Sequence, residues 1–258
     1  MIHIKSNEEI NKMRHGGHIL SEVLHEVVSF AKVGVTELEL DALAERLIKE
    51  KGGEPGFKRV KGYHYTICAS TNDVVVHGIP THYAYKEGDI AGIDCGLYYQ
   101  GLHTDMAETI LVSTQNSKLK TQNSEKGKFL ETGKRALDAA IKQAKAGNRI
   151  GHISKTIQDI VEKESGYSIV RSLVGHGVGR QLHEEPEVPG FLQDSIEKTP
   201  VLKPGMTIAI EVIYNMGGKE VIYKGNDDWT ISTKDRSISG VFERTVLIAD
   251  TGPEILTA

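Results

Sequence analysis

The sequence predicts an α+β protein made of a duplicated unit, in which each copy supplies a helix pair and then strands. Two observations predict this class. Helical patterns come in pairs, once near the start and once past the middle of the chain, and strand patterns follow them. Fragments of the first half also recur in the second, which makes the repeat about 125 residues long. The recurring fragments are "AKVG" (31–34) with "AKAG" (144–147), "VVHGIP" (75–80) with "VGHGVG" (174–179), and "KEGDIAGID" (86–94) with "KPGMTIAIE" (203–211).

The first half begins with two predicted helices, residues 8–31 and 36–51, each with apolar residues at helical spacing. Thr36 and Glu39 form a capping box at the start of the second helix. Strand patterns follow, and the last two of them predict a β-hairpin. These patterns are "TICAS" (66–70), "DVVVHG" (73–78), "DIAGIDCG" (89–96) and "DMAETILV" (105–112).

A polar stretch at residues 113–128, in which "TQNS" occurs twice, predicts a solvated connection between the halves. The second helix pair is predicted beyond it, at 129–146 and 152–165. We therefore expect a single domain, residues 1–258. Its two pseudo-symmetric halves would be about 1–112 and 129–258.

The composition is that of an ordinary globular protein, with 39% hydrophobic and 26% charged residues in a chain of 258. A net charge of −4 shows no excess of positive charge, so nucleic acid is not an expected partner. No apolar stretch approaches the roughly 18 residues that span a bilayer, so no membrane contact is expected. The two cysteines, Cys68 and Cys95, are expected to be small buried residues and suit a reducing cytoplasm.

The predicted hairpin "GIDCGLYYQGLHTDMAET" (92–109) carries Asp94 and Asp105 near the same level of its two strands. Like charges opposed across a strand pair are destabilising, and burying them unpaired costs several kcal/mol per charge. Glu211 in "TIAIEVIYN" and Glu243 in "GVFERTVLI" also interrupt apolar strand patterns. An edge strand or a structural ion pair would explain any one of these acids. Four of them, with Asp94 and Glu211 at matching places of the repeat, favour a shared divalent cation.

His176, in "VGHGVG", joins these acids as a candidate ligand. Carboxylates with one imidazole suit Mn, Fe(II), Co or Zn. Four carboxylates are more than one ion usually requires, whereas two ions about 3.5–4 Å apart would use them. Such a pair would neutralise the hairpin aspartates, generate hydroxide near neutral pH and polarise a carbonyl.

Two other histidines are either packing residues or cleft residues on sequence grounds alone. His77 precedes a Gly-Ile-Pro turn, and His183 follows His176 by seven positions in a glycine-rich stretch. His103 shares the strand face of Asp105 and is a weaker candidate ligand. Other catalytic schemes lack their motifs, because the chain has no Gly-x-Ser-x-Gly elbow, phosphate-binding loop, Cys-x-x-Cys pair or His-Glu-x-x-His helix.

Taken together, these residues resemble the methionine aminopeptidases, specifically the bacterial-type (type I) enzymes. The resemblance implies the pita-bread fold, with helices outside a curved, pseudo-symmetric antiparallel sheet. It also implies a cytoplasmic enzyme that removes the initiator methionine from nascent proteins with two divalent metal ions (Co, Mn, Fe(II) or Zn). The matching segments run in family order over nearly the whole chain: "NDVVVHGIP", "GDIAGIDCG", "HTDMAET", "GHGVGRQLHEEPEVPGF", "LKPGMTIAIE" and "DDWTISTKDRSISGVFERTVLI".

The resemblance also implies a role for each candidate residue. His77 would contact the residue after methionine, and His183 would stabilise the tetrahedral intermediate. Glu211 would carry a proton from the attacking water to the leaving amine. The metal ligands would be Asp94, Asp105, His176, Glu211 and Glu243. The methionine pocket would be lined by Tyr63, Cys68 and Trp229, and sulfur with aromatic rings suits a thioether.

The chain departs from the family pattern in four places. Val212 stands where proline is usual, and Arg244 stands where histidine is expected. The "DCG" at 94–96 is more typical of relatives outside type I, and the 113–128 connection is longer than usual. No departure removes a ligand, so the departures bear on metal preference and pocket detail.

Two other functions are weighed against this one. A proline-directed aminopeptidase or dipeptidase shares the fold, but such relatives carry an extra N-terminal domain, whereas here the first repeat starts near residue 8. A partner-binding protein of this fold usually lacks ligands, and here all five are present. The 35 residues from His176 to Glu211 leave no room for the large insertion of the eukaryotic-type enzymes. We expect a monomer that acts on peptide N-termini; ribosome association suits the role, although no residue specifies it.

Overall fold

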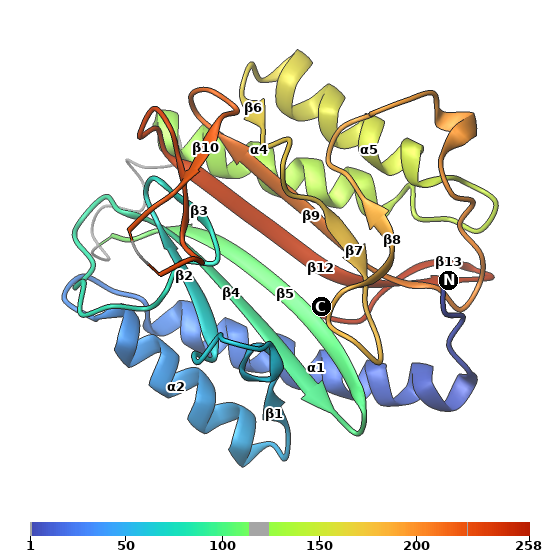
Figure 1. Cartoon of the computed structure of the whole chain (residues 1–258), viewed down its shortest axis with the longest axis horizontal. Coiled ribbons are helices and arrows are strands. Elements are labelled where there is room, and N and C mark those ends of the chain that lie inside the picture. Colours follow the sequence, from blue (N-terminus) through green and yellow to red (C-terminus); the bar gives the residue numbers. More distant parts are fainter. Residues whose placement is uncertain (1, 114–123, 226) are drawn as a thin grey trace.

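Four long antiparallel strands form the centre of the molecule and lie side by side in Figure 1. The computed structural model describes residues 2–113, 124–225 and 227–258. The central strands, in spatial order, are β4 (Ile90–Tyr99), β5 (Leu102–Leu111), β12 (Ser239–Ala249) and β9 (Thr207–Asn215).

Shorter strands extend this sheet on both sides. Beyond β4 lie β1 (Glu54–Pro55) and β2 (Ile67–Thr71), and beyond β9 lie β7 (Gly175–Gly177), β8 (Glu184–Val188) and β6 (Ser168–Ile169). The last strand, β13 (Gly252–Ile255), pairs with β12. A separate small sheet consists of β10 (Val221–Tyr223), β11 (Ile231–Thr233) and β3 (Val74–Val76).

The helices flank the sheet in two pairs, as Figure 1 shows below and above the central strands. The first pair is α1 (Asn7–Phe30) and α2 (Glu37–Glu50), which confirms the predicted helices and the predicted Thr36–Glu39 capping box. The second pair is α4 (Glu125–Ile141) and α5 (Ile150–Gln158), and α5 continues as a π-helical segment over Asp159–Glu164. Short 3₁₀ turns lie at Phe57–Arg59 and Ile196–Lys198. Within the described residues, no helix is long and apolar enough to cross a membrane.

The start of α4 differs from the sequence prediction. The helix was expected from residue 129, but it begins at Glu125, because the side chain of Ser124 accepts a hydrogen bond from Gly127 N at 3.1 Å. Residues 125–128 are polar because they form an outward-facing first turn. The polar connection is therefore shorter than predicted, and its residues 114–123 lie outside the described part of the chain.

Alternation along the strands separates a helix-covered face from an opposite face, here called the open face, part of which packs against the small sheet. On β4, Ile93 and Cys95 belong to the core that α1 and α2 form, so Asp94 points to the other side. On β9, Ile210 and Val212 likewise pack into the core of α4 and α5. Full burial of such a side chain contributes about 1.5–3 kcal/mol, so the helix-covered face holds the register that presents the acids on the open face.

The two halves meet at one seam, where β5 pairs with β12. The helices α1 and α2 share a core with the β4–β5 side, and α4 and α5 share a core with the β9–β12 side. This arrangement confirms the predicted α+β fold with a duplicated, pseudo-twofold unit.

One predicted equivalence between the halves is wrong. The sequence repeat matched His77 with His176, but β3, which precedes His77, pairs with β11 in the small sheet. His176 lies in β7, which pairs with β9 in the main sheet. The first-half strand in the place of β7 is β2, which pairs with β4. A shared His-Gly motif does not specify the strand with which a segment pairs.

Candidate metal centre

Strand register places three of the predicted ligands in one row across the open face. Asp94 pairs with Cys68 on one side and with Ala107 on the other. Ala107 pairs in turn with Glu243, and Glu243 pairs with Glu211. Paired residues project from the same face of a sheet, so this row brings three carboxylates and a thiol together.

A second row lies beside the first and carries the other two predicted ligands. Asp105 exchanges hydrogen bonds with Thr245 across the seam, each 2.9 Å long. Thr245 pairs with Ala209, and Ala209 pairs with His176. The hairpin aspartates therefore stand diagonally rather than at one level, since Asp105 pairs with Gly96 and not with Asp94.

The glycines around His176 allow its strand to enter the sheet. A Cβ at Gly175 would lie 2.5 Å from Ala209 O, and a Cβ at Gly177 would lie 2.2 Å from Glu185 O. Only glycine permits backbones to approach so closely. The ring is then oriented by Nδ1, which lies 2.8 Å from Gly177 O, while Nε2 faces Glu211 Oε1 at 3.4 Å.

The donor set fits a divalent cation. Asp105, His176 and Glu243 each offer a ligand atom, and these atoms lie within 4.8 Å of one another. All three residues are buried. Within the described residues, Asp94 Oδ1 and Glu243 Oε1 are buried and have no hydrogen-bond partner. Buried charges of this kind are normally paired or bound to a metal.

Burial dominates the electrostatics of the cluster. It raises the pKa of Asp94 to about 7, and it raises the pKa values of Asp105, Glu211 and Glu243 well above the usual range. The neighbouring carboxylates add to this effect, Asp94 on Asp105 and Asp105 on Glu243. Burial also lowers the pKa of His176 to about 3, which keeps the imidazole neutral and able to act as a ligand.

Arg244 does not neutralise the cluster. Its guanidinium points to the other face of β12, where it forms an ion pair with Glu108 and donates to Ala107 O at 3.2 Å. The four carboxylates therefore lack a facing cation among the described residues, and a metal is the partner that their chemistry suits.

The cluster forms part of the lining of a cavity of about 300 Å³. All ten residues predicted for the site line this cavity, including His77, His183, Tyr63, Cys68 and Trp229. The structure thus brings the ten together, while their individual roles stay predictions.

Sequence reasoning missed several lining residues. Ile213 follows Glu211 by two positions on β9, so strand alternation could have placed it on the same face. Most of the others lie in loops or in a 3₁₀ turn, where no periodic signal exists. The missed residues are Phe57, Val60, Val76, Ser172, Leu173, Val174, Leu182 and Ile213.

One wall of the cavity is apolar and aromatic. The Tyr63 and Trp229 rings are 5.1 Å apart, edge to face, and Cys68 is buried in the same cluster as Tyr63. The Tyr63 hydroxyl donates to Ile67 O at 2.8 Å, so its polar atom is satisfied. Trp229 is held by Asp227, whose Oδ1 accepts from Trp229 N at 2.9 Å. This wall suits a flexible apolar side chain.

The two other predicted histidines line the same cavity. His77 has a φ of +55°, an uncommon conformation for a non-glycine residue, and its ring lies 6.4 Å from the Trp229 ring. The His183 ring lies 4.3 Å from the His176 ring. Burial lowers the pKa of His77 to about 4 and also lowers that of His183, so both rings are neutral near pH 7.

The weaker candidate, His103, is buried against the Tyr98 ring at 4.8 Å and lies outside the group of three that could hold an ion. Both cysteines are buried and free, as predicted.

Comparisons with known proteins agree with this geometry. The family model of metallopeptidase family M24 matches residues 11–250. The methionine aminopeptidase of Clostridium perfringens is 41% identical over 258 residues, with 100% of this chain and 99% of the relative covered. Methionine aminopeptidase 1 of Bacillus subtilis is 40% identical over 257 residues, with coverage of 100% and 99%.

Solved structures show the same fold. The methionine aminopeptidase from Thermotoga maritima has a TM-score of 0.92 and 39% identity, with 100% of this chain and 99% of that chain covered. The prolidase from Pyrococcus horikoshii has a TM-score of 0.76 and 25% identity, with coverage of 99% and 63%. These likenesses confirm the predicted pita-bread fold and the resemblance to bacterial methionine aminopeptidases. The chain therefore belongs to metallopeptidase family M24.

Proposed function

We propose that this chain is a methionine aminopeptidase, which hydrolyses the first peptide bond of proteins that begin with methionine. The observation that carries the proposal is the cavity itself. Part of its lining is the two rows of acids with His176, and another part is the apolar cluster of Tyr63, Cys68 and Trp229. Few substrates need both a metal-binding acid cluster and a slot for a thioether side chain.

The proposed ligands are the five residues of the two rows, Asp94, Asp105, His176, Glu211 and Glu243. Four carboxylates and one imidazole are the donors that Mn, Fe(II), Co or Zn accept, and the number of carboxylates favours two ions. Bound there, the ions would lower the pKa of a water and polarise the scissile carbonyl.

The chain's own residues account for exopeptidase action. With a methionine side chain against Tyr63, Cys68 and Trp229, the free α-amine of the substrate would lie near the acid rows, which line the same cavity. An amine that binds a metal in those rows must be free, so no residue could precede the methionine. Only the first residue of a peptide satisfies both conditions.

Three side chains are placed to assist the reaction. His183, a neutral imidazole beside His176, would donate a hydrogen bond to the negative charge that develops on the carbonyl oxygen. Glu211 would accept a proton from the attacking water and deliver it to the leaving amine. His77, which also lines the cavity, would contact the residue that follows methionine.

The test is methionine release from Met-Gly-Met-Met by metal-stripped protein, with Mn, Co, Fe(II) or Zn added back. We expect metal-dependent release that Asp94→Ala lowers by about a thousandfold or more, because the variant loses a ligand. The matched control is Glu50→Gln, which removes an acid from an exposed ion pair with Arg46 and should keep activity within about threefold. A peptide with an acetylated N-terminus should not be cleaved. Release without metal, or equal loss in both variants, would refute the proposal.

A proline-directed peptidase remains a second candidate because the Pyrococcus horikoshii prolidase shares the fold. Cleavage of Xaa-Pro peptides by the metal-loaded protein, without release from Met-Gly-Met-Met, would select it. The cytoplasmic location, the monomeric state and action on nascent chains at the ribosome belong to the proposed role of initiator methionine removal.

A further inference from the structure

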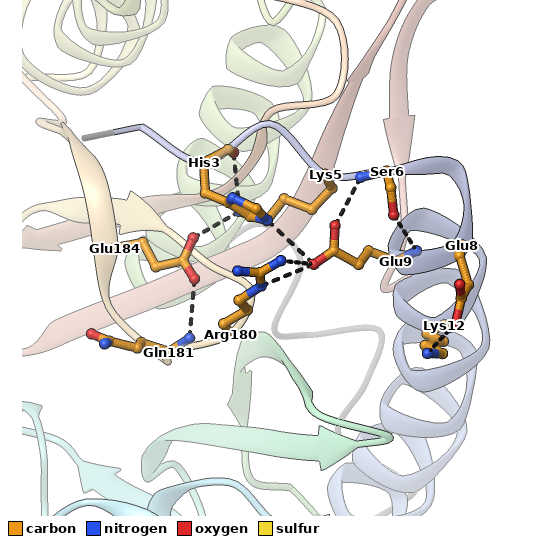
Figure 2. A network of polar contacts seen from close by, with 9 residues as sticks. All are labelled: His3, Lys5, Ser6, Glu8, Glu9, Lys12, Arg180, Gln181 and Glu184. Atoms are coloured by element: carbon orange, nitrogen blue, oxygen red, sulfur yellow. Dashed lines mark hydrogen bonds and ion pairs between the residues drawn. The ribbon is translucent and has the colours of Figure 1, made fainter.

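A polar network joins the N-terminal segment to the turn that carries His183 (Figure 2). Lys5 Nζ donates to Glu184 Oε2 at 2.7 Å, and the Lys5 side chain is only 1% exposed. Lysine is almost never buried to this extent unless it is paired. Glu184 is the residue directly after His183. The ion pair is therefore one residue away along the chain from His183, whose side chain lines the cavity.

Glu184 uses its second oxygen to close the turn. Its Oε1 accepts from Gln181 N at 3.0 Å, so one carboxylate holds both the turn and the lysine. The turn is fixed at its other end by Gly179, whose carbonyl accepts from His103 N at 2.6 Å. His183 lies between these two anchors.

Lys5 is itself held rigidly. Its backbone N donates to Gly205 O at 2.8 Å, and Gly205 N donates to Ile248 O on β12 at 2.9 Å. Its aliphatic stem packs on the turn, because a Cβ at Gly179 would lie 2.4 Å from Lys5 Cε. The lysine thus connects the main sheet to the turn with little freedom to move.

A second link runs in parallel but is more exposed. Arg180 donates from Nε to Glu9 Oε1 at 3.0 Å, and Glu9 is the acid of the α1 capping box. The Arg180 side chain is 64% exposed, and ion pairs at that exposure contribute little. Of the two side-chain links, the Lys5 ion pair is therefore the one expected to place the turn.

We propose that Lys5 is a positioning residue, which through Glu184 holds the His183 ring at the place from which it hydrogen-bonds the reacting carbonyl oxygen. The inference rests on the proposed function, because it assigns Lys5 an effect on that reaction. A misplacement of about 1 Å in a group of this kind can lower the rate about a hundredfold. A purely structural ion pair would instead change stability and leave the rate of the folded protein alone.

The test compares Lys5→Met with Lys12→Met in the full-length, metal-loaded protein. Methionine keeps the length of the stem and removes the charge, and Lys12 forms an exposed pair with Glu8 on the same segment of chain, also drawn in Figure 2. We expect Lys5→Met to lower kcat for Met-Gly-Met-Met at least tenfold with KM changed less than twofold. Lys12→Met should leave both unchanged.

A double-mutant cycle with His183→Ala distinguishes positioning from general damage. If Lys5 acts through His183, adding Lys5→Met to His183→Ala should lower kcat by less than twofold. Equal losses in the two backgrounds, or an unchanged kcat in Lys5→Met alone, would overturn the inference. Should Lys5→Met fail to fold, Glu184→Gln is used in the same cycle, since its amide oxygen can still accept from Gln181 N.

A spectroscopic readout separates failure of this inference from failure of the proposed function. The ring signals of His183 in a ¹H–¹⁵N spectrum should shift or broaden in Lys5→Met and stay in place in Lys12→Met. A wild-type protein that releases no methionine would refute the proposed function, and these signals would still decide whether Lys5 places the ring. Unchanged His183 signals in Lys5→Met would refute the inference whatever the activity.

Discussion

Replacing Asp105 by asparagine should stabilise the metal-free protein and remove most of its stabilisation by metal. The ligand atoms of Asp105 and Glu243 lie within 4.8 Å of each other. Two full charges at that separation repel by about 3.5 kcal/mol at an effective dielectric constant of about 20. Partial protonation relieves some of this repulsion, so we expect Asp105→Asn to raise the free energy of unfolding by about 1–3 kcal/mol without metal. The asparagine oxygen can still accept the hydrogen bond that Met106 N donates at 3.0 Å.

Metal should stabilise the wild type more than the variant and so narrow or reverse the difference between their free energies of unfolding. An ion at a hundred times its dissociation constant stabilises the native state by about 2.7 kcal/mol. The wild type should show this gain, whereas Asp105→Asn, which lacks a ligand, should gain less than about 1 kcal/mol. The assay is urea unfolding at pH 8, with a chelator or with Mn(II), followed by fluorescence of the single tryptophan, which lines the cavity.

The matched control is Asp89→Asn, at another buried aspartate. Asp89 accepts hydrogen bonds from Asn72 Nδ2 at 2.9 Å and from the Tyr83 hydroxyl at 2.8 Å. Loss of such bonds to a charged group costs about 1.5–3 kcal/mol, so this variant should be less stable with and without metal and should keep the metal response. If Asp105→Asn also destabilised the metal-free protein, or kept the full gain from metal, the interpretation of the acid rows would be wrong.

Three other predictions concern specificity, pH and packing. Asp227→Ala frees the turn that carries Trp229 and should raise KM for methionine peptides about tenfold with kcat nearly unchanged, as steady-state kinetics would show; a fall in kcat alone would contradict this. The backbone N–H of the α1 N-cap lowers the pKa of Glu9 to about 2. The contribution of the Glu9 carboxylate to the free energy of unfolding is therefore present above the usual pKa of 4.5 and is lost as pH falls toward 2. Glu9→Gln should therefore lower the free energy of unfolding by about 1–2 kcal/mol at pH 7 and leave it unchanged near pH 2; an equal loss at both pH values would exclude the electrostatic cause. In Gly133→Ala the new Cβ would lie 2.4 Å from the Phe242 ring, and the melting temperature should fall by about 2–8 °C in calorimetry, whereas a rise would show that helix propensity wins.

The sequence alone predicted the members of the site better than their relative positions. An acid inside an apolar strand pattern is conspicuous, and four of them converge because alternation sends each to the face that the helices leave open. The diagonal placement of Asp94 and Asp105 depends on hairpin register, which the turn at Gln100–Gly101 sets. Both turn residues have positive φ values, +47° and +92°, and a shift of one residue would have turned one aspartate into the core.

Loop residues escaped prediction because nothing local marks them. Phe57 and Leu173 line the cavity only after their segments fold over the sheet, and neither lies in a periodic pattern. The same limit explains the false match of His77 with His176. Local sequence similarity does not specify which strands pair with each other. The position of β7 between β9 and β8 depends on the glycines at 175 and 177, which allow the backbones to approach closely.

The seam between β5 and β12 makes catalytic competence depend on the docking of the two halves. Asp94 and Asp105 come from one side of it, and Glu211 and Glu243 come from the other. The first half of the chain contains α1, α2, β4 and β5, but it carries only two of the five proposed ligands. The contacts that complete the site are long-range in sequence, and such contacts form slowly. Activity is therefore an all-or-none reporter of the docking of the two halves, and no intermediate with one folded half could hydrolyse a peptide.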